Sequence, residues 1–141
     1  MKLFLDANVL FSAVYSPEGR ARALFDIADA GHCSLCTSAF ALEEARRNLA
    51  LKSPEKLSNL GRILPPLTIV PEPPPEKVTW ARGLPLPMKD APIMAAAVAC
   101  AADILVTGDR RDFGHLYGKS SDKVLVLSPR EALGEVLKRI K

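Results

Sequence analysis

The sequence has few of the features that mark membrane, secreted or zinc-binding proteins. It contains only three cysteines and two histidines. Its longest apolar stretches reach about ten residues, whereas a helix that crosses a membrane needs about 20. No signal peptide precedes the first apolar segment at residues 3–5. We therefore expect a soluble, cytoplasmic protein that makes no contact with a membrane.

The cysteines do not form a recognisable zinc or redox motif. Cys33 and Cys36 make a C-x-x-C pair, but no second such pair and no pair of histidines completes a zinc site. In redox proteins the motif opens a helix, which lowers the thiol pKa, whereas this pair is expected where a helix ends before a strand. We interpret Cys33, Cys36 and Cys100 as small buried apolar residues.

Length and composition indicate one globular domain. The chain has 141 residues, of which 48% are hydrophobic and 25% charged, which is sufficient for a core. The formal net charge of +3 is compatible with a phosphate-rich partner without requiring one. We expect residues 1–141 to form a single domain.

Proline is concentrated in one region, because nine of the twelve prolines lie between Pro65 and Pro92. The segments on either side are too small to close separate sheets, so an interdomain linker is the weaker interpretation. The pattern predicts a rigid loop region within one domain, at about residues 65–92. One strand and a short turn containing Trp80 are expected to interrupt it.

Short apolar runs alternate with helical patterns along the chain. Arg20 to Ala30 has an apolar stripe at helical spacing, and Ser53-Pro54 and Ser128-Pro129 are typical helix starts. Glu131 would complete a capping box with Ser128. The alternation predicts a layered α/β fold with a mostly parallel sheet. The predicted strands lie at residues 3–5, 34–37, 67–70, 104–107 and 124–127.

Two aspartates follow predicted buried strands. Asp6 ends the first strand, and Asp109 comes just after the strand at 104–107. Open α/β sheets bind ligands at the carboxyl ends of their strands, near the point where the strand order reverses. The two carboxylates can therefore converge on one crevice. Alternatively, each aspartate only caps the helix that follows it.

Further acidic residues can join this crevice from helices. Asp90 precedes a helix that is apolar almost all round, and it can act as a cap, as a site residue or as both. Glu44 flanks the predicted buried stripe of its helix, whereas Glu43 points nearly opposite, toward solvent. Asp112 can supply a fifth acid, or it can cap a helix or pair with the neighbouring arginines.

Clustered carboxylates indicate a metal site. They repel one another and raise one another's pKa unless a cation neutralises them. Oxygen ligands suit Mg²⁺ or Mn²⁺, and the lack of suitable histidine or cysteine ligands argues against zinc. Such ions can activate water and stabilise the leaving oxygen during attack on a phosphodiester.

Four segments, taken together, resemble the motifs of PIN-domain nucleases. They occur in the order and at the approximate spacing typical of that family, and the resemblance covers essentially the whole chain. The C-terminal Leu-Ser-Pro-Arg-Glu-Ala-Leu also resembles the family's closing strand and helix. The four segments are Leu-Asp-Ala-Asn-Val-Leu, Leu-Glu-Glu-Ala-Arg-Arg-Asn-Leu, Asp-Ala-Pro-Ile-Met-Ala-Ala-Ala and Val-Thr-Gly-Asp-Arg-Arg-Asp-Phe.

The resemblance implies a three-layer α/β/α sandwich around a five-stranded parallel sheet, with a Mg²⁺- or Mn²⁺-dependent ribonuclease site. Asn8 and Thr107 match positions that often line this site. The implied catalytic and metal-binding residues are Asp6, Glu44, Asp90 and Asp109, with Asp112 as an accessory metal ligand.

The same resemblance bears on substrate and partners. Many small PIN-domain proteins are VapC-type toxins of toxin–antitoxin pairs, which implies an RNA substrate, a small antitoxin and a homodimer. The proline-rich region is longer than expected for a minimal toxin. Arg110 and Arg111 flank Asp109 and are the candidates for contacts with substrate phosphates.

Other functions fit less well or stay open. A haloacid-dehalogenase-type phosphatase needs an aspartate where this chain has Asn8, and a receiver domain needs a lysine after its last strand, where this chain has Ser-Pro-Arg. A PIN-like module that binds nucleic acid or acts as a scaffold without turnover remains the alternative, because a fold alone does not determine activity.

Overall fold

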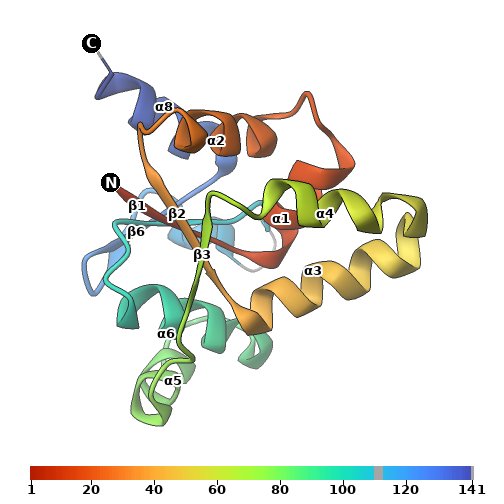
Figure 1. The fold of residues 1–141 in the computed structure, drawn as a ribbon. Helices are drawn as coiled ribbons and strands as arrows, with labels where there is room; N and C mark the ends of the chain where they lie inside the picture. Colours follow the sequence, from red (N-terminus) through yellow and green to blue (C-terminus); the bar gives the residue numbers. More distant parts are fainter. Residues whose placement is uncertain (110–112, 141) are drawn as a thin grey trace.

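A six-stranded sheet forms the centre of the molecule in the computed structural model, which describes residues 1–109 and 113–140 (Figure 1). The strand order is β3-β2-β1-β4-β6-β5. All neighbouring strands pair in parallel except β5, which is antiparallel to β6. The strands are β1 (Lys2–Leu5), β2 (Ser34–Ser38), β3 (Leu67–Val70), β4 (Ile104–Val106), β5 (Ser120–Ser121) and β6 (Val124–Leu127).

The predicted α/β fold with a mostly parallel sheet is confirmed, and each of the five predicted strands is present. The structure adds β5, a sixth strand of two residues, which joins β6 through the tight turn at Asp122 and Lys123. Two residues are too few to produce a recognisable apolar or alternating pattern, so the sequence did not predict this edge strand.

Helices cover both faces of the sheet, as a three-layer sandwich requires. Figure 1 shows α2 and α8 on one side of the sheet, α5 and α6 on the opposite side, and α3 and α4 extending together away from it. In the described part of the chain, no helix is long and apolar enough to cross a membrane. The helices are α1 (Ala7–Tyr15), α2 (Arg20–Asp29), α3 (Ala39–Lys52), α4 (Leu57–Ile63), α5 (Pro75–Arg82), α6 (Ala91–Ala99) and α8 (Pro129–Lys138), with 3₁₀ turns η1 (Pro54–Lys56), η2 (Met88–Asp90) and η3 (Gly114–Leu116).

Two predicted helix starts can be compared with the structure. Ser128 and Glu131 form the predicted capping box at the start of α8. Ser53-Pro54 begins the short turn η1 instead, and α4 follows only from Leu57. The serine side chain makes no capping hydrogen bond there, and the first turn is a 3₁₀ turn that precedes the α-helix.

The region at about residues 65–92 contains more regular structure than the predicted loop. It includes β3, α5 and η2, and Trp80 lies in helix α5 and not in a short turn. Pro75 occupies the first helical position, where its fixed φ favours a helix and its missing N–H costs nothing. The helix is held by packing against α6, with Ala81 fully buried.

The order of the strands creates a crevice at one edge of the sheet. The chain proceeds outward from β1 through β2 to β3, and then β4 and β6 lie on the other side of β1. The strand order therefore reverses between β1 and β4, which pair directly. In folds of this kind, the carboxyl ends of the two strands at this point form the ligand-binding crevice.

Candidate functional site

Asp6 is buried at the carboxyl end of β1, where only 4% of its surface is exposed. Its Oδ1 atom accepts a hydrogen bond from the Ala7 N–H at 2.7 Å, so the side chain caps α1. Its Oδ2 atom accepts hydrogen bonds from the Thr107 hydroxyl at 2.9 Å and from the Asn8 amide at 3.2 Å. Asp6 is thus both a helix cap and part of a network in the crevice.

Thr107 joins the ends of β1 and β4. It is fully buried, and its hydroxyl donates to Asp6 while accepting from the Asp109 N–H at 3.1 Å. The Asn8 amide also donates to this hydroxyl, at 3.3 Å. The Asn8 Oδ1 atom accepts from the Gly108 N–H at 2.7 Å, which orients the amide. The residues that follow β4 are therefore held directly beside Asp6.

The surroundings of Asp6 disfavour its charged form. The pKa of Asp6 is raised from 3.8 to about 6, mainly by burial and to a smaller extent by the negative charges of Glu44 and Asp109, while hydrogen bonds from Thr107 and Ala7 oppose the rise. Because Glu44 and Asp109 act on Asp6 through their charges, the structure brings these three acids together from β1, α3 and the end of β4.

The two neighbouring glutamates of α3 lie on different sides of the helix, as the sequence pattern predicts. Glu44 is partly buried. Glu43 is exposed and forms a surface ion pair with Arg46, with 3.2 Å between its carboxylate and the guanidinium. Of this pair, Glu44 is the acid whose charge contributes to the raised pKa of Asp6.

Asp90 is buried, with 8% of its surface exposed, at the start of α6. Its backbone is already helical and its side chain makes no capping hydrogen bond, so the helix-cap interpretation does not hold for Asp90. Helix α6 packs against β2 and β4, the strands that lead into the helix of Glu44 and into Asp109.

The acids offer oxygen ligands of the type that Mg²⁺ and Mn²⁺ prefer. Within residues 1–109 and 113–140, however, no three side chains of histidine, cysteine, aspartate or glutamate are grouped closely enough to hold a metal ion. The chemistry fits such an ion, because a cation would offset the burial and repulsion that raise the pKa of Asp6. Three further predicted site residues, Arg110, Arg111 and Asp112, lie outside the described part of the chain.

A cavity of about 360 Å³ opens at this crevice and gives access to it from solvent. Asp109, Asn8 and Gly108 line it, together with Ser12 of α1 and Pro129 of α8. The sequence motifs predicted the first two residues. They did not predict that Ser12 and Pro129 would line the cavity, because that depends on how α1 and α8 pack over the sheet.

Three solved structures share this fold along almost their whole length. VapBC2 from Rickettsia felis, solved bound to a DNA fragment from its promoter, matches with a TM-score of 0.66 and 19% identity, over 91% of this chain and 98% of that one. FitAcB from Neisseria gonorrhoeae matches with a TM-score of 0.59 and 23% identity, over 91% and 98%. PAE2754 from Pyrobaculum aerophilum matches with a TM-score of 0.64 and 19% identity, over 98% and 99%.

The family comparison is more specific than these structural similarities, which at such identities show the fold alone. No curated protein matches the chain. The family model described as "PIN domain" matches residues 2–111, which include β1 to β4 and the acids Asp6, Glu44, Asp90 and Asp109. The chain therefore belongs to the PIN-domain family.

Proposed function

We propose that this PIN-domain protein is a metal-dependent endoribonuclease that hydrolyses phosphodiester bonds in RNA. The observation that carries the proposal is the buried Asp6 carboxyl, which lies where the strand order reverses, next to the charges of Glu44 and Asp109. A buried carboxyl beside two further negative charges is unfavourable by itself, so a function that requires a bound cation explains its presence. PIN domains are generally nucleases, which supports the same reaction.

In this proposal, Asp6, Glu44, Asp90 and Asp109 are catalytic residues that hold Mg²⁺ or Mn²⁺, with Asp112 as an accessory ligand. When bound, the ion lowers the pKa of a water molecule and stabilises the leaving oxygen. Asn8 and Thr107 keep the Asp6 carboxylate oriented through their hydrogen bonds to Oδ2.

Substrate contacts and partners form the next part of the proposal. Arg110 and Arg111 contact backbone phosphates and position the RNA without reading its bases. A small antitoxin silences the enzyme, as in VapC-type pairs, and the protein acts in the cytoplasm as a homodimer. The structural similarity to VapBC2 and FitAcB supports the toxin–antitoxin role.

A cleavage assay tests the reaction. Purified protein is expected to cut a panel of labelled single-stranded RNAs with Mg²⁺ or Mn²⁺ and to lose this activity with a chelator. Asp6→Asn removes a ligand charge and is expected to abolish cleavage, whereas Asp29→Asn, an exposed change on α2, is the matched control.

Two outcomes would count against the proposal. Cleavage that persists both in chelator and in the Asp6→Asn variant would exclude the carboxylate–metal mechanism. Specific RNA binding without cleavage under all metal conditions would instead favour the alternative function, a PIN-like module that binds nucleic acid without catalysis.

A further inference from the structure

The cavity beside the acids continues into a second cavity of about 290 Å³. The two share Ser12, Gly108 and Pro129 along their walls, so they form one groove. One end of the groove is at Asp109, within the acidic crevice, and the other end is lined by Arg20 and Arg130. We call it the arginine groove.

The far end of the arginine groove is positively charged. Of the described residues that line the second cavity, only Arg20 and Arg130 are charged. Both are exposed, at the first turns of α2 and α8. Neither guanidinium forms a hydrogen bond or an ion pair within residues 1–109 and 113–140. Their donors are therefore available to an anionic ligand.

The groove wall is attached to the candidate site. The Tyr117 hydroxyl, which lines the second cavity, donates a hydrogen bond to the Thr107 carbonyl at 2.7 Å. The Thr107 hydroxyl in turn donates a hydrogen bond to Asp6 and accepts one from the Asp109 N–H. A ligand that lies along this wall is therefore held in a defined position relative to the acids.

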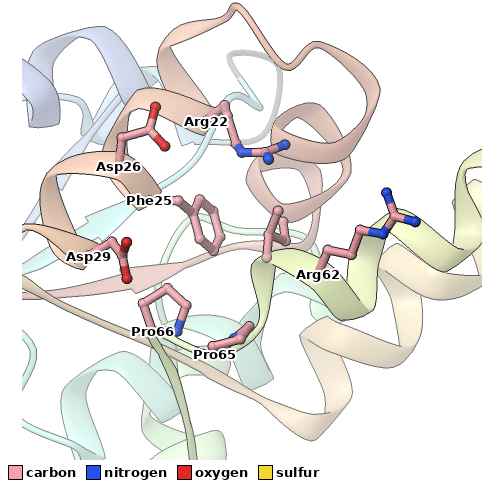
Figure 2. A pocket seen from close by; sticks show the side chains of 8 residues that line it. Arg22, Phe25, Asp26, Asp29, Arg62, Pro65 and Pro66 are labelled. Atoms are coloured by element: carbon pink, nitrogen blue, oxygen red, sulfur yellow. The ribbon is translucent and has the colours of Figure 1, made fainter.

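A different pocket shows what distinguishes the arginine groove. Figure 2 shows Arg22, Asp26 and Asp29 on α2 and Arg62 on α4 around this pocket, so its two arginines are balanced by two aspartates. The Arg22 guanidinium also donates to the Ala13 carbonyl at 3.3 Å. This pocket has no net positive charge to attract a phosphate.

We propose that the arginine groove binds the backbone of a single-stranded RNA on one side of the cleaved bond, with phosphates contacting Arg20 and Arg130. The inference rests on the proposed ribonuclease function and adds a substrate-binding subsite to it. Guanidinium groups bind phosphate through paired, charge-assisted hydrogen bonds. Such contacts position the strand without selecting a sequence.

The test is binding of a labelled single-stranded RNA, measured by fluorescence anisotropy in chelator and over a range of salt concentrations. The double variant Arg20→Gln/Arg130→Gln is compared with Arg22→Gln/Arg62→Gln, which changes the net charge equally. The first is expected to bind about tenfold more weakly. The slope of the logarithm of the binding constant against the logarithm of the salt concentration is expected to become smaller in magnitude by about 1.4, which corresponds to the loss of two phosphate contacts. The control is expected to bind like the parent.

Two further measurements complete the design. Arg20→Lys/Arg130→Lys is expected to restore most of the affinity and all of the salt dependence, because the charges return without the paired geometry. In cleavage assays, Arg20→Gln/Arg130→Gln is expected to raise KM with little change in kcat. Thermal melts verify that every variant is folded.

The outcomes separate the subsite from the reaction. The subsite proposal is overturned if the two glutamine double variants lose affinity equally, or if Arg20→Gln/Arg130→Gln binds RNA like the parent. Neither result contradicts the proposed ribonuclease function. The unsubstituted protein can also bind RNA through Arg20 and Arg130 in chelator and yet cleave no RNA with any metal ion. That result would support the subsite and contradict the proposed ribonuclease activity.

Discussion

Asp6 is a carboxyl group whose ionisation opposes folding, because its pKa is about 6 in the native state and 3.8 is its ordinary value. Below about pH 4 it is protonated in both states. Between about pH 4 and 6 the native state keeps a proton that the unfolded state releases, so stability falls as the pH rises. Above pH 6 the full penalty of about 3 kcal/mol is present.

The Asp6→Asn variant without metal is therefore expected to be more stable than the parent by about 1–3 kcal/mol at pH 7. This gain should become small near pH 4, where the parent Asp6 is also largely uncharged in the native state. Urea denaturation of both proteins at the two pH values measures the difference. A difference in stability that is the same at pH 4 and pH 7 would show that the charge of Asp6 is not the cause.

Glu43 and Glu44 provide a matched pair of substitutions. Glu44→Gln is expected to lower the cleavage rate by orders of magnitude, because loss of a ligand charge changes both the occupancy and the position of the metal. Glu43→Gln removes only a surface ion pair and should change stability by less than about 0.5 kcal/mol. Initial rates at saturating Mg²⁺ compare the variants, and equal rates would mean that Glu44 is not a ligand.

The cysteines differ in burial and in thiol pKa in a way that the sequence did not predict. Cys36 is buried, as expected, but Cys33 and Cys100 are only partly buried. The Cys36 thiol lies 3.9 Å from the Cys100 sulfur, and the hydrogen bond between them lowers the pKa of Cys100 to about 7, aided by the charge of Lys2. Burial raises the pKa of Cys33.

Cys100 is therefore expected to react with iodoacetamide about tenfold faster than Cys33 near pH 7, because the thiolate is the nucleophile. Replacing Cys36 with alanine removes the hydrogen-bond donor and should slow the reaction of Cys100. Mass spectrometry of the modified peptides over time measures both rates. Faster labelling of Cys33 would contradict this assignment.

Among the elements, the β5–β6 hairpin carries local strain. Its two-residue turn places Asp122 at φ 47° and Lys123 at φ 71°. Such hairpins favour glycine at the second position, because a side chain in the left-handed region costs roughly 1–2 kcal/mol. The pairing of Ser121 with Val124 on either side of the turn nevertheless fixes the lysine in this conformation.

Lys123→Gly is expected to raise the free energy of unfolding by about 0.5–1 kcal/mol, after allowing for the greater freedom of glycine in the unfolded chain. Lys119→Gly, at a nearby exposed position outside the turn, is the control and should be neutral or destabilising. Urea denaturation measures both. Equal destabilisation by the two changes would show that the turn does not carry this strain.

At the scale of the whole molecule, metal binding and folding are linked, because only the native state gathers the acids. Mg²⁺ or Mn²⁺ at a hundred times its dissociation constant should stabilise the protein by about 2.7 kcal/mol. Asp109→Asn should leave the metal-free protein as stable or more stable, but weaken the metal-induced rise in Tm. Asp29→Asn should keep the full rise. A metal-free protein destabilised by Asp109→Asn would instead indicate that Asp109 only caps a helix.

Much of this fold was predictable from the sequence, because its signals are local. Apolar runs identified five strands, and Ser128, Pro129 and Glu131 marked the start of α8. The 3.6-residue period of α3 was enough to place Glu43 toward solvent and Glu44 inward. Each of these features depends on residues within a few positions of one another.

Only the tertiary structure determined the contacts that build the crevice. The Thr107 hydroxyl reaches Asp6 across 101 positions of sequence, and the Gly108 N–H reaches Asn8 across 100. These contacts exist because β1 pairs with β4, whereas periodicity and helix caps contain no information about which strands become neighbours. The meeting of Arg20 and Arg130 at one groove has the same origin, because packing of α2 against α8 brings together helix starts that are far apart in the chain.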